Sequence, residues 1–307
     1  MYLSFYGIRE KPFSATPDPK FLYLTRRHRE ALAQLTYGVQ NEVGFVLLTG
    51  EVGTGKTTLL RTLLSRLDGA TAAAFVFNST LSFDGLLEYI LEDFGIAQAG
   101  ESQAQRLVAL NNFLIERHRA GQRTILILDE AQNLTLETLE QIRLLSNFET
   151  PAAKLLQILL VGQPELRTKL RLPQMRQLQQ RIALRFSIGP LSPEETREYV
   201  YLRLRVAGAR DLGIFTPRAI QRIADYAGGI PRLVNILCDH CLIIGYADQK
   251  RRIEPDLVEE ACAFLDEGLP RKRATLGAWF RTVGTFSATA VAGLFGLARA
   301  ARALVVR

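Results

Sequence analysis

A glycine-rich segment, Gly50–Thr57, constrains the fold of this chain more than any other feature. It reads Gly-Glu-Val-Gly-Thr-Gly-Lys-Thr and fits the pattern G-x-x-x-x-G-K-[ST]. A short apolar run, 44–49, precedes it, and residues 57–67 carry leucines at helical spacing, so a buried strand, a loop and a helix are predicted. Because such a loop turns backbone N–H groups and a helix N-terminus toward negative charge, we expect it to bind phosphate.

The side chains of this loop divide the work of nucleotide binding. Lys56 is expected to neutralise the β- and γ-phosphates, and Thr57 to bind Mg²⁺. The predicted phosphate-binding residues are Gly50, Glu51, Val52, Gly53, Thr54, Gly55, Lys56, Thr57 and Thr58.

Two adjacent carboxylates follow a second apolar run. Leu126–Leu128 leads directly into Asp129 and Glu130, at the carboxyl end of a predicted strand. In a parallel sheet this edge is where ligands bind, so the acids are expected to meet the phosphate loop there. Asp129 would hold Mg²⁺, and Glu130 would activate water as a general base. The chain has no Asn-Lys-x-Asp guanine-reading motif, which favours ATP as the nucleotide.

Strands and helices alternate through the first part of the chain. The pattern predicts strands at 44–49, 72–77, 124–128 and 155–161, and helices at 26–39, 57–67, 83–94, 104–120 and 136–147. This spacing is typical of an α/β domain with a parallel sheet covered by helices on both faces.

The alternation stops near Pro190, and only helices follow. They are predicted at 193–207, 217–227, 231–247 and 255–266, three of them with Ser, Thr or Glu before a proline at the first helical position. The predicted divisions are a lead and helix packing on the nucleotide site (1–40), the α/β nucleotide-binding domain (41–190), a helical lid (191–268) and a basic apolar tail (269–307).

The formal net charge of +7 belongs to the tail. Seven basic and no acidic residues follow Glu267, which leaves 31 of each in residues 1–267. A neutral body argues against nucleic-acid binding, and a basic tail favours contact with an anionic surface. Met1–Lys20 lacks the apolar run of a signal peptide, and three cysteines are too few for a disulfide framework, so we expect a cytoplasmic protein.

Residues 282–298 form an uncharged stretch flanked by arginines. Three interpretations stay open for it. It can lie as a basic, partly amphipathic helix on an anionic membrane, form a short spanning or re-entrant segment, or pack as a helix between subunits or end the chain flexibly.

These motifs, in this order, resemble those of the AAA+ ATPases. The resemblance implies roles for polar residues beyond the two loops. Gln163 matches the first sensor of the γ-phosphate, and Asn78 matches a polar residue that restrains the catalytic glutamate. Arg181, or else Arg185, matches an arginine finger supplied to a neighbouring subunit, and Arg232 in Gly228–Arg232 matches the second sensor.

Within the AAA+ proteins, the chain is similar to the secretion-ATPase family, which includes the general secretion pathway protein A type and relatives of pilus and exopolysaccharide export. The segments that carry this resemblance are Phe5–Gly7, Lys11–Phe13, Thr16–Pro19, Phe21–Leu24, His28, Thr49–Gly53, Asp129–Leu134 and Val161–Leu166. It implies a ring-forming ATPase with adenine held between the lead and the lid. Secretin-assembling members continue into a periplasmic domain, whereas this chain ends at Arg307, so the shorter polysaccharide- or pilus-associated relatives look closer.

The expected function is therefore ATP hydrolysis, with Mg²⁺, that assembles or drives a cell-envelope export system. The predicted partners are other copies of the chain, export proteins and the anionic inner-membrane surface, reached from the cytoplasm through the tail. The main alternative is a DNA-binding ATPase that regulates transposition, since such ATPases share this architecture. A third interpretation is a scaffold in which ATP only gates assembly.

Overall fold

The computed structural model describes residues 2–14, 18–67, 69–77, 81–96, 100–151 and 153–267. Contacts group Met1–Cys262 into one compact unit and place Ala263–Arg307 in a second. Asn78 and the tail from 269 onward, to which the sequence assigns functions, lie outside the described residues.

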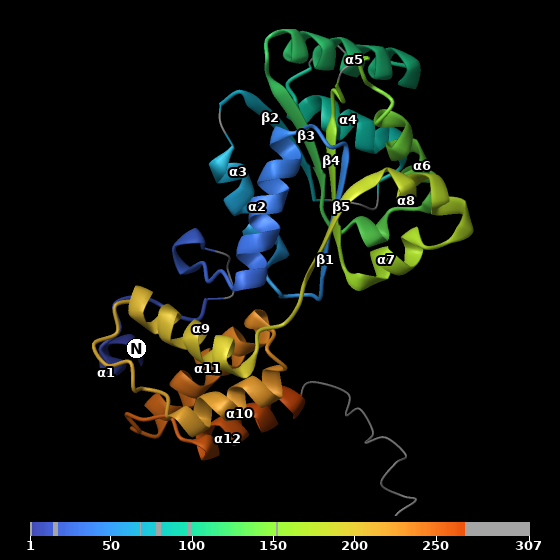
Figure 1. Cartoon of the computed structure of the whole chain (residues 1–307). Coiled ribbons are helices and arrows are strands. Elements are labelled where there is room, and N and C mark those ends of the chain that lie inside the picture. The colour runs from blue at the N-terminus through green and yellow to red at the C-terminus, as the bar shows by residue number, and fades with distance from the viewer. Residues whose placement is uncertain are drawn as a thin grey trace, which may run out of the picture. The chain divides into compact units, whose positions relative to one another are not determined.

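A parallel sheet forms the centre of the nucleotide-binding part (Figure 1). Its strands are β1 (Phe45–Gly50), β2 (Thr71–Val76), β3 (Arg123–Leu128), β4 (Gln157–Gly162) and β5 (Ile182–Ile188). Their order in space is β2-β3-β4-β1-β5, and every neighbouring pair runs parallel. The predicted α/β fold class is confirmed. Because β1 and β3 both border β4, the loop after β1 and the acids after β3 lie near one another at the same edge.

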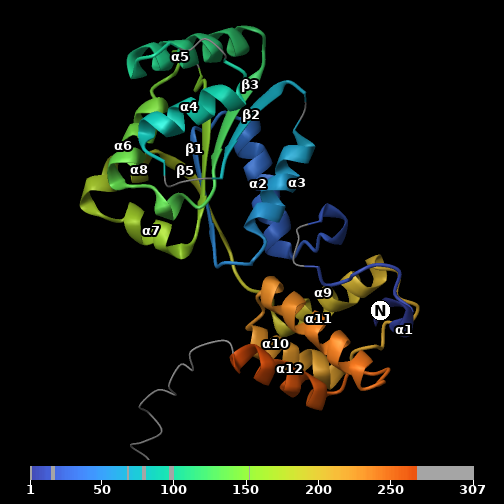
Figure 2. The same cartoon turned by 180° about the vertical axis from the view of Figure 1, so that it is seen from behind.

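Helices cover both faces of the sheet (Figures 1 and 2). They are α2 (Arg26–Gln40) and α3 (Lys56–Arg66) on one face, and α4 (Phe83–Asp93), α5 (Gln103–Arg119), α6 (Leu136–Leu145), α7 (Pro164–Leu170) and α8 (Arg176–Arg181) on the other. Strand β1 serves both cores: Val46 and Leu48 pack with α2 and α3, and Phe45 and Leu47 pack into the opposite cluster. This two-sided burial explains why β1 is apolar throughout.

The sequence analysis missed β5, since it predicted four strands. The side chains of β5 alternate, with Ile182 and Ile188 buried and Arg185 exposed. This alternation arises because β5 is an edge strand, whereas the predicted strands were recognised as continuous apolar runs. Short helices were missed as well: α1 (Tyr2–Tyr6), α7, α8 and the 3₁₀ turns η1 (Pro19–Phe21), η2 (Ala131–Asn133) and η3 (Pro173–Met175).

Between the sheet and residue 267, the structure describes four helices: α9 (Pro193–Val206), α10 (Pro217–Ala227), α11 (Pro231–Ala247) and α12 (Pro255–Glu267). Each lies within one residue of its predicted bounds. The caps explain this accuracy, because the Ser192 hydroxyl accepts a hydrogen bond from the Glu195 backbone N–H while the Glu195 carboxylate accepts one from Ser192 N–H. Cys238, Cys241 and Cys262 are buried in this bundle, and burial raises the pKa of Cys241 to about 12.

Gly229, just before α11, contacts the backbone just before α9. The N–H of Leu191 donates to the carbonyl of Gly229 over 2.8 Å. Gly229 has φ +73°, and a Cβ there would lie 2.0 Å from the Leu191 carbonyl oxygen. Only glycine fits this contact, so Gly229 fixes the start of α11 against the start of α9.

Candidate functional site

The phosphate loop connects the end of β1 to the start of α3, as its sequence predicts. Gly53 and Gly55 have φ values of +81° and +100°, which other residues rarely adopt. A Cβ on Gly50 would lie 2.7 Å from the Ile188 carbonyl oxygen, so this position has no room for a side chain. No side chain caps the first turn of α3, which leaves its N–H groups to an anionic ligand.

The ammonium group of Lys56 lies against the loop itself. It donates to the carbonyl oxygens of Gly50 at 2.8 Å and Glu51 at 3.1 Å. Burial lowers the pKa of Lys56, and the nearby carboxylates of Glu130 and Asp129 partly offset that effect. The group is therefore a buried cation beside carboxylates, in a position where a phosphate would pair with it.

Thr57 and Asp129 bring two oxygen donors together. The Thr57 hydroxyl donates to Asp129 Oδ2 over 3.2 Å, and the other carboxylate oxygen accepts from Glu130 N–H at 2.9 Å. Burial raises the pKa of Asp129, against the lowering effect of these two hydrogen bonds. A hydroxyl and a carboxylate beside a phosphate loop are the hard donors that Mg²⁺ accepts, so the residues fit the predicted metal.

The carboxylate of Glu130 is held by two amides. Gln132 Nε2 donates to its Oε2 at 2.5 Å and Gln163 Nε2 at 3.2 Å. Burial raises the pKa of Glu130, but these hydrogen bonds and the Lys56 charge outweigh it, so the pKa lies below its ordinary value. Glu130 is thus ionised and able to accept a proton. Sequence reasoning had not singled out Gln132, whose only signal was its place in the Asp129–Leu134 segment.

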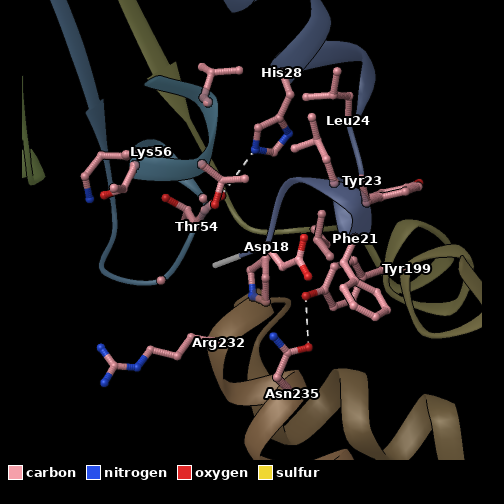
Figure 3. Close-up of a pocket in the computed structure, with 18 of the residues that line it drawn as sticks. Asp18, Phe21, Tyr23, Leu24, His28, Thr54, Lys56, Tyr199, Arg232 and Asn235 are labelled. Carbon is pink, nitrogen blue, oxygen red and sulfur yellow. Dashed lines mark hydrogen bonds between the residues drawn. The ribbon is translucent and has the colours of Figure 1, made fainter. Parts of the chain in front are cut away.

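A cavity of about 430 Å³ opens beside the loop (Figure 3). The predicted site residues that line it are Val52, Gly53, Thr54, Gly55, Lys56, Thr57, Thr58, Glu130 and Arg232. Asp129 and Gln163 do not line the cavity, but they hydrogen-bond to Thr57 and Glu130, which do. Arg181 does not line it.

His28 of α2 joins the lead to the phosphate loop (Figure 3). It is 5% exposed, its Nδ1 lies 2.7 Å from the Thr25 hydroxyl, and its Nε2 lies 3.2 Å from the Thr54 carbonyl oxygen. Burial lowers the pKa of His28, partly offset by its contact with Thr54, so the ring is neutral at physiological pH. Because Thr54 O can only accept, Nε2 carries the hydrogen. No site role had been predicted for His28.

A second unpredicted residue, Arg203 of α9, binds the lead to the lid. Its buried guanidinium donates to the carbonyl oxygens of Pro12 at 2.5 Å and Ser14 at 3.2 Å, and it lies 4.6 Å from the centre of the Phe21 ring. It also donates to the Tyr199 hydroxyl, which donates to Asn235 Oδ1 at 2.9 Å (Figure 3). All of these residues except Pro12 line the cavity, so this network shapes part of its wall.

Arg232 begins the lid helix α11 directly beside the loop. Its N–H donates to the Gly53 carbonyl oxygen at 3.4 Å, and a Cβ on Gly53 would lie only 2.7 Å from the Cβ of Arg232. Figure 3 shows Arg232 on this helix, facing the cavity from the lid side. The location suits the predicted second sensor.

The two arginine-finger candidates have different surroundings. The Arg181 guanidinium donates to the C-terminal end of α6, at Arg143 O (3.1 Å), Ser146 Oγ (2.6 Å) and Asn147 Oδ1 (2.7 Å). Arg185 is exposed on β5, donates to the Gln179 carbonyl at 2.5 Å and lines a smaller cavity of about 150 Å³. Nη1 of Arg181 therefore contacts the end of α6 within its own subunit, and Arg185 is the more exposed of the two.

Comparison with known sequences identifies the α/β part. Residues 40–170 match the model of the AAA domain family. The chain is 47% identical over 254 residues to general secretion pathway protein A of Aeromonas hydrophila. The match takes in 82% of this chain and 46% of that protein, so the chain spans about half the length of the relative.

Solved structures share the fold at low sequence identity. The Aeropyrum pernix ORC2 protein, in ADPNP and ADP complexes, has a TM-score of 0.60 and 21% identity, with 83% of this chain and 71% of that chain covered. Cdc6p from Pyrobaculum aerophilum has a TM-score of 0.62 and 22% identity, with 80% and 70% covered. These similarities establish the fold alone.

Proposed function

We propose that this chain, which belongs to the AAA+ ATPases of the general secretion pathway protein A type, hydrolyses ATP to assemble or drive a cell-envelope export system. The observation that carries hydrolysis is that the charges of Lys56 and Glu130 lie near each other at one sheet edge, and both residues line a cavity large enough for a nucleotide. Export is supported by the 47% identity to general secretion pathway protein A over most of this chain.

Each residue of the site has a proposed task. The loop Gly50–Thr58 and Lys56 bind the phosphates, Arg232 and Gln163 sense the γ-phosphate, and Glu130 takes a proton from the attacking water. Thr57 and Asp129 would hold Mg²⁺, which supplies charge neutralisation between the phosphates when bound. The lid and the lead hold adenine on the far side of the cavity, within the wall that Arg203 organises.

We also propose that the active form is a ring in which Arg181 completes the site of the next subunit. Arg181→Ala should then hydrolyse ATP poorly, and mixing it with Lys56→Ala subunits should restore turnover. Rescue is expected because the Arg181→Ala subunit keeps its loop and the Lys56→Ala subunit keeps its arginine. The measurement is phosphate release against mixing ratio.

Arg185→Ala is the matched comparison for that experiment, because it removes the more exposed arginine four residues away. If only Arg185→Ala were rescued, the arginine finger would be Arg185 and not Arg181. If neither variant were rescued, the result would argue against a site shared between subunits. A normal rate for Arg181→Ala would show that its hydrogen bonds to α6 serve only the subunit's own stability.

The proposed location is the cytoplasmic face of the inner membrane, with the tail as the contact. Among the described helices, none has the length and apolar character needed to cross a bilayer. The proposal rests on the sequence of 269–307, whose seven positive charges lie beyond the last acidic residue. Basic residues near an anionic surface gain about 1 kcal/mol each.

Flotation with liposomes tests the membrane contact. The full chain should float with vesicles containing phosphatidylglycerol, and residues 1–268 should stay at the bottom of the gradient. The basic residues predict weaker flotation at high salt and with uncharged vesicles. Equal behaviour of the two proteins would refute the role of the tail.

A further inference from the structure

The backbone at Glu130 is in an unusual conformation. Its φ is +51°, in the left-handed region that residues other than glycine rarely occupy. Such a conformation costs on the order of 1–3 kcal/mol and persists only where the surroundings impose it. Glu130 sits between the end of β3 and the 3₁₀ turn η2, so the contacts of that turn should explain how the conformation is kept.

The side chain of Gln132, within η2, bridges Glu130 and β4. Its Nε2 donates to Glu130 Oε2 at 2.5 Å, and its Oε1 accepts from the backbone N–H of Gln163 at 3.0 Å. The amide has only one orientation that satisfies both partners, because a carboxylate only accepts and a backbone N–H only donates. No other residue type of this length offers a donor and an acceptor together.

Two neighbours hold Gln132 in place. Lys169 of α7 donates to the carbonyl oxygens of Gln132 at 2.5 Å and Leu134 at 2.7 Å, which anchors the backbone of η2. At Gly162, the last residue of β4, a Cβ would lie 2.6 Å from Gln132 Oε1. The glycine therefore leaves the space that the Gln132 amide occupies.

We propose that Gln132 is a positioning residue that sets the orientation of the Glu130 carboxylate and ties it to Gln163 at the end of β4. This inference rests on the proposed function, in which Glu130 is the base and Gln163 senses the γ-phosphate. A shift of the β4 end is then transmitted to the base through the Gln132 side chain, in addition to the direct hydrogen bond from Gln163 Nε2. Gln132 itself does not line the cavity, and it acts on the reaction through its hydrogen bond to Glu130.

Gln132→Met tests the role of the amide, because methionine has a similar length and keeps no hydrogen-bonding group. We expect kcat to fall on the order of 10- to 100-fold, since misplacing a catalytic group by about 1 Å costs this much. KM for ATP should stay within about two-fold, because the loop and Lys56 are unchanged. Gln103→Met, at an exposed position that starts α5, is the matched control and should behave like wild type.

Gly162→Ala tests the same bridge without changing Gln132. The added methyl group would displace Oε1 from the Gln163 N–H, so the variant should show the same loss of kcat with an unchanged KM. The double variant should lose no more than about two-fold beyond Gln132→Met, because Gln132→Met already removes the hydrogen bond that Gly162→Ala breaks. Thermal unfolding of each protein establishes that it is folded.

The outcomes separate this inference from the function on which it rests. If wild type turns over and Gln132→Met keeps its kcat, the positioning role is refuted while hydrolysis stands. The bridge would also be refuted if the kcat losses of the two single variants multiplied in the double variant. A rise in KM that accounted for the whole loss of kcat/KM would refute it too. If wild type releases no more phosphate than Lys56→Ala, the proposed hydrolysis fails and the positioning role with it.

Discussion

Glu130→Gln should bind ATP and fail to hydrolyse it, with turnover reduced by roughly 10²- to 10⁴-fold. The amide has the shape of the carboxylate and can still accept from Gln132, but it cannot take a proton from water. ATP should therefore accumulate in the site and hold the proposed ring in its ATP-bound state. Single-turnover hydrolysis of radiolabelled ATP measures the defect, and filter binding measures the retained nucleotide.

The matched control is Glu137→Gln, an exposed carboxylate in the first turn of α6. It changes the net charge by the same amount as Glu130→Gln, so it separates the loss of the base from a change in overall charge. It should hydrolyse ATP at the wild-type rate. Normal turnover by Glu130→Gln would show that the base has been assigned to the wrong residue.

Lys56→Ala should lose nucleotide binding itself. Lys56 is 5% exposed and its ammonium group lies on two loop carbonyls, so it is a largely desolvated cation at the proposed phosphate site. Truncating one partner of a buried charge pair costs about 2–5 kcal/mol, which corresponds to a Kd roughly 30- to 5,000-fold higher. Isothermal titration with ATP measures this change directly.

Lys154→Ala serves as the control for that experiment, because Lys154 pairs with Glu149 on the surface, away from the cavity lining. Its Kd for ATP should equal that of wild type. An unchanged Kd in Lys56→Ala would mean that the loop amides alone hold the phosphates, and the predicted role of the lysine would be wrong.

Local signals account for the parts of the fold that were predicted. The loop Gly50–Thr57, the buried strands and the proline-started lid helices each depend on neighbours within a few residues, and their bounds agree with the structure closely. Strand β5 depends on tertiary context, since only its contact with β1 distinguishes its alternating pattern from a surface loop. The helix α1 was likewise missed because it is stabilised from afar, by bonds of Tyr2 and Tyr6 to α11 and its end.

The candidate site divides in the same way. Lys56, Thr57, Asp129 and Glu130 follow from two short motifs, and their roles remain predictions that the geometry supports. Gln132 also bonds Gln163, 31 residues away, and Arg203 bonds Pro12, 191 residues away; no local pattern shows these two contacts. The sequence also leaves the choice between Arg181 and Arg185 open, because that choice depends on the tertiary contacts of each side chain.

The contact between Gly53 and Arg232 has a thermodynamic consequence for any protein that binds the lid. The loop and α11 meet backbone to backbone, with no space for a side chain between them. With Arg232 of α11 as the proposed sensor of the γ-phosphate, the position of α11 and the occupancy of the loop would be linked equilibria, and linkage is reciprocal. A binding partner that draws α11 away from the loop would lower the affinity for ATP by some factor, and ATP would lower the affinity for that partner by the same factor. Measuring one of these affinity ratios therefore gives the other.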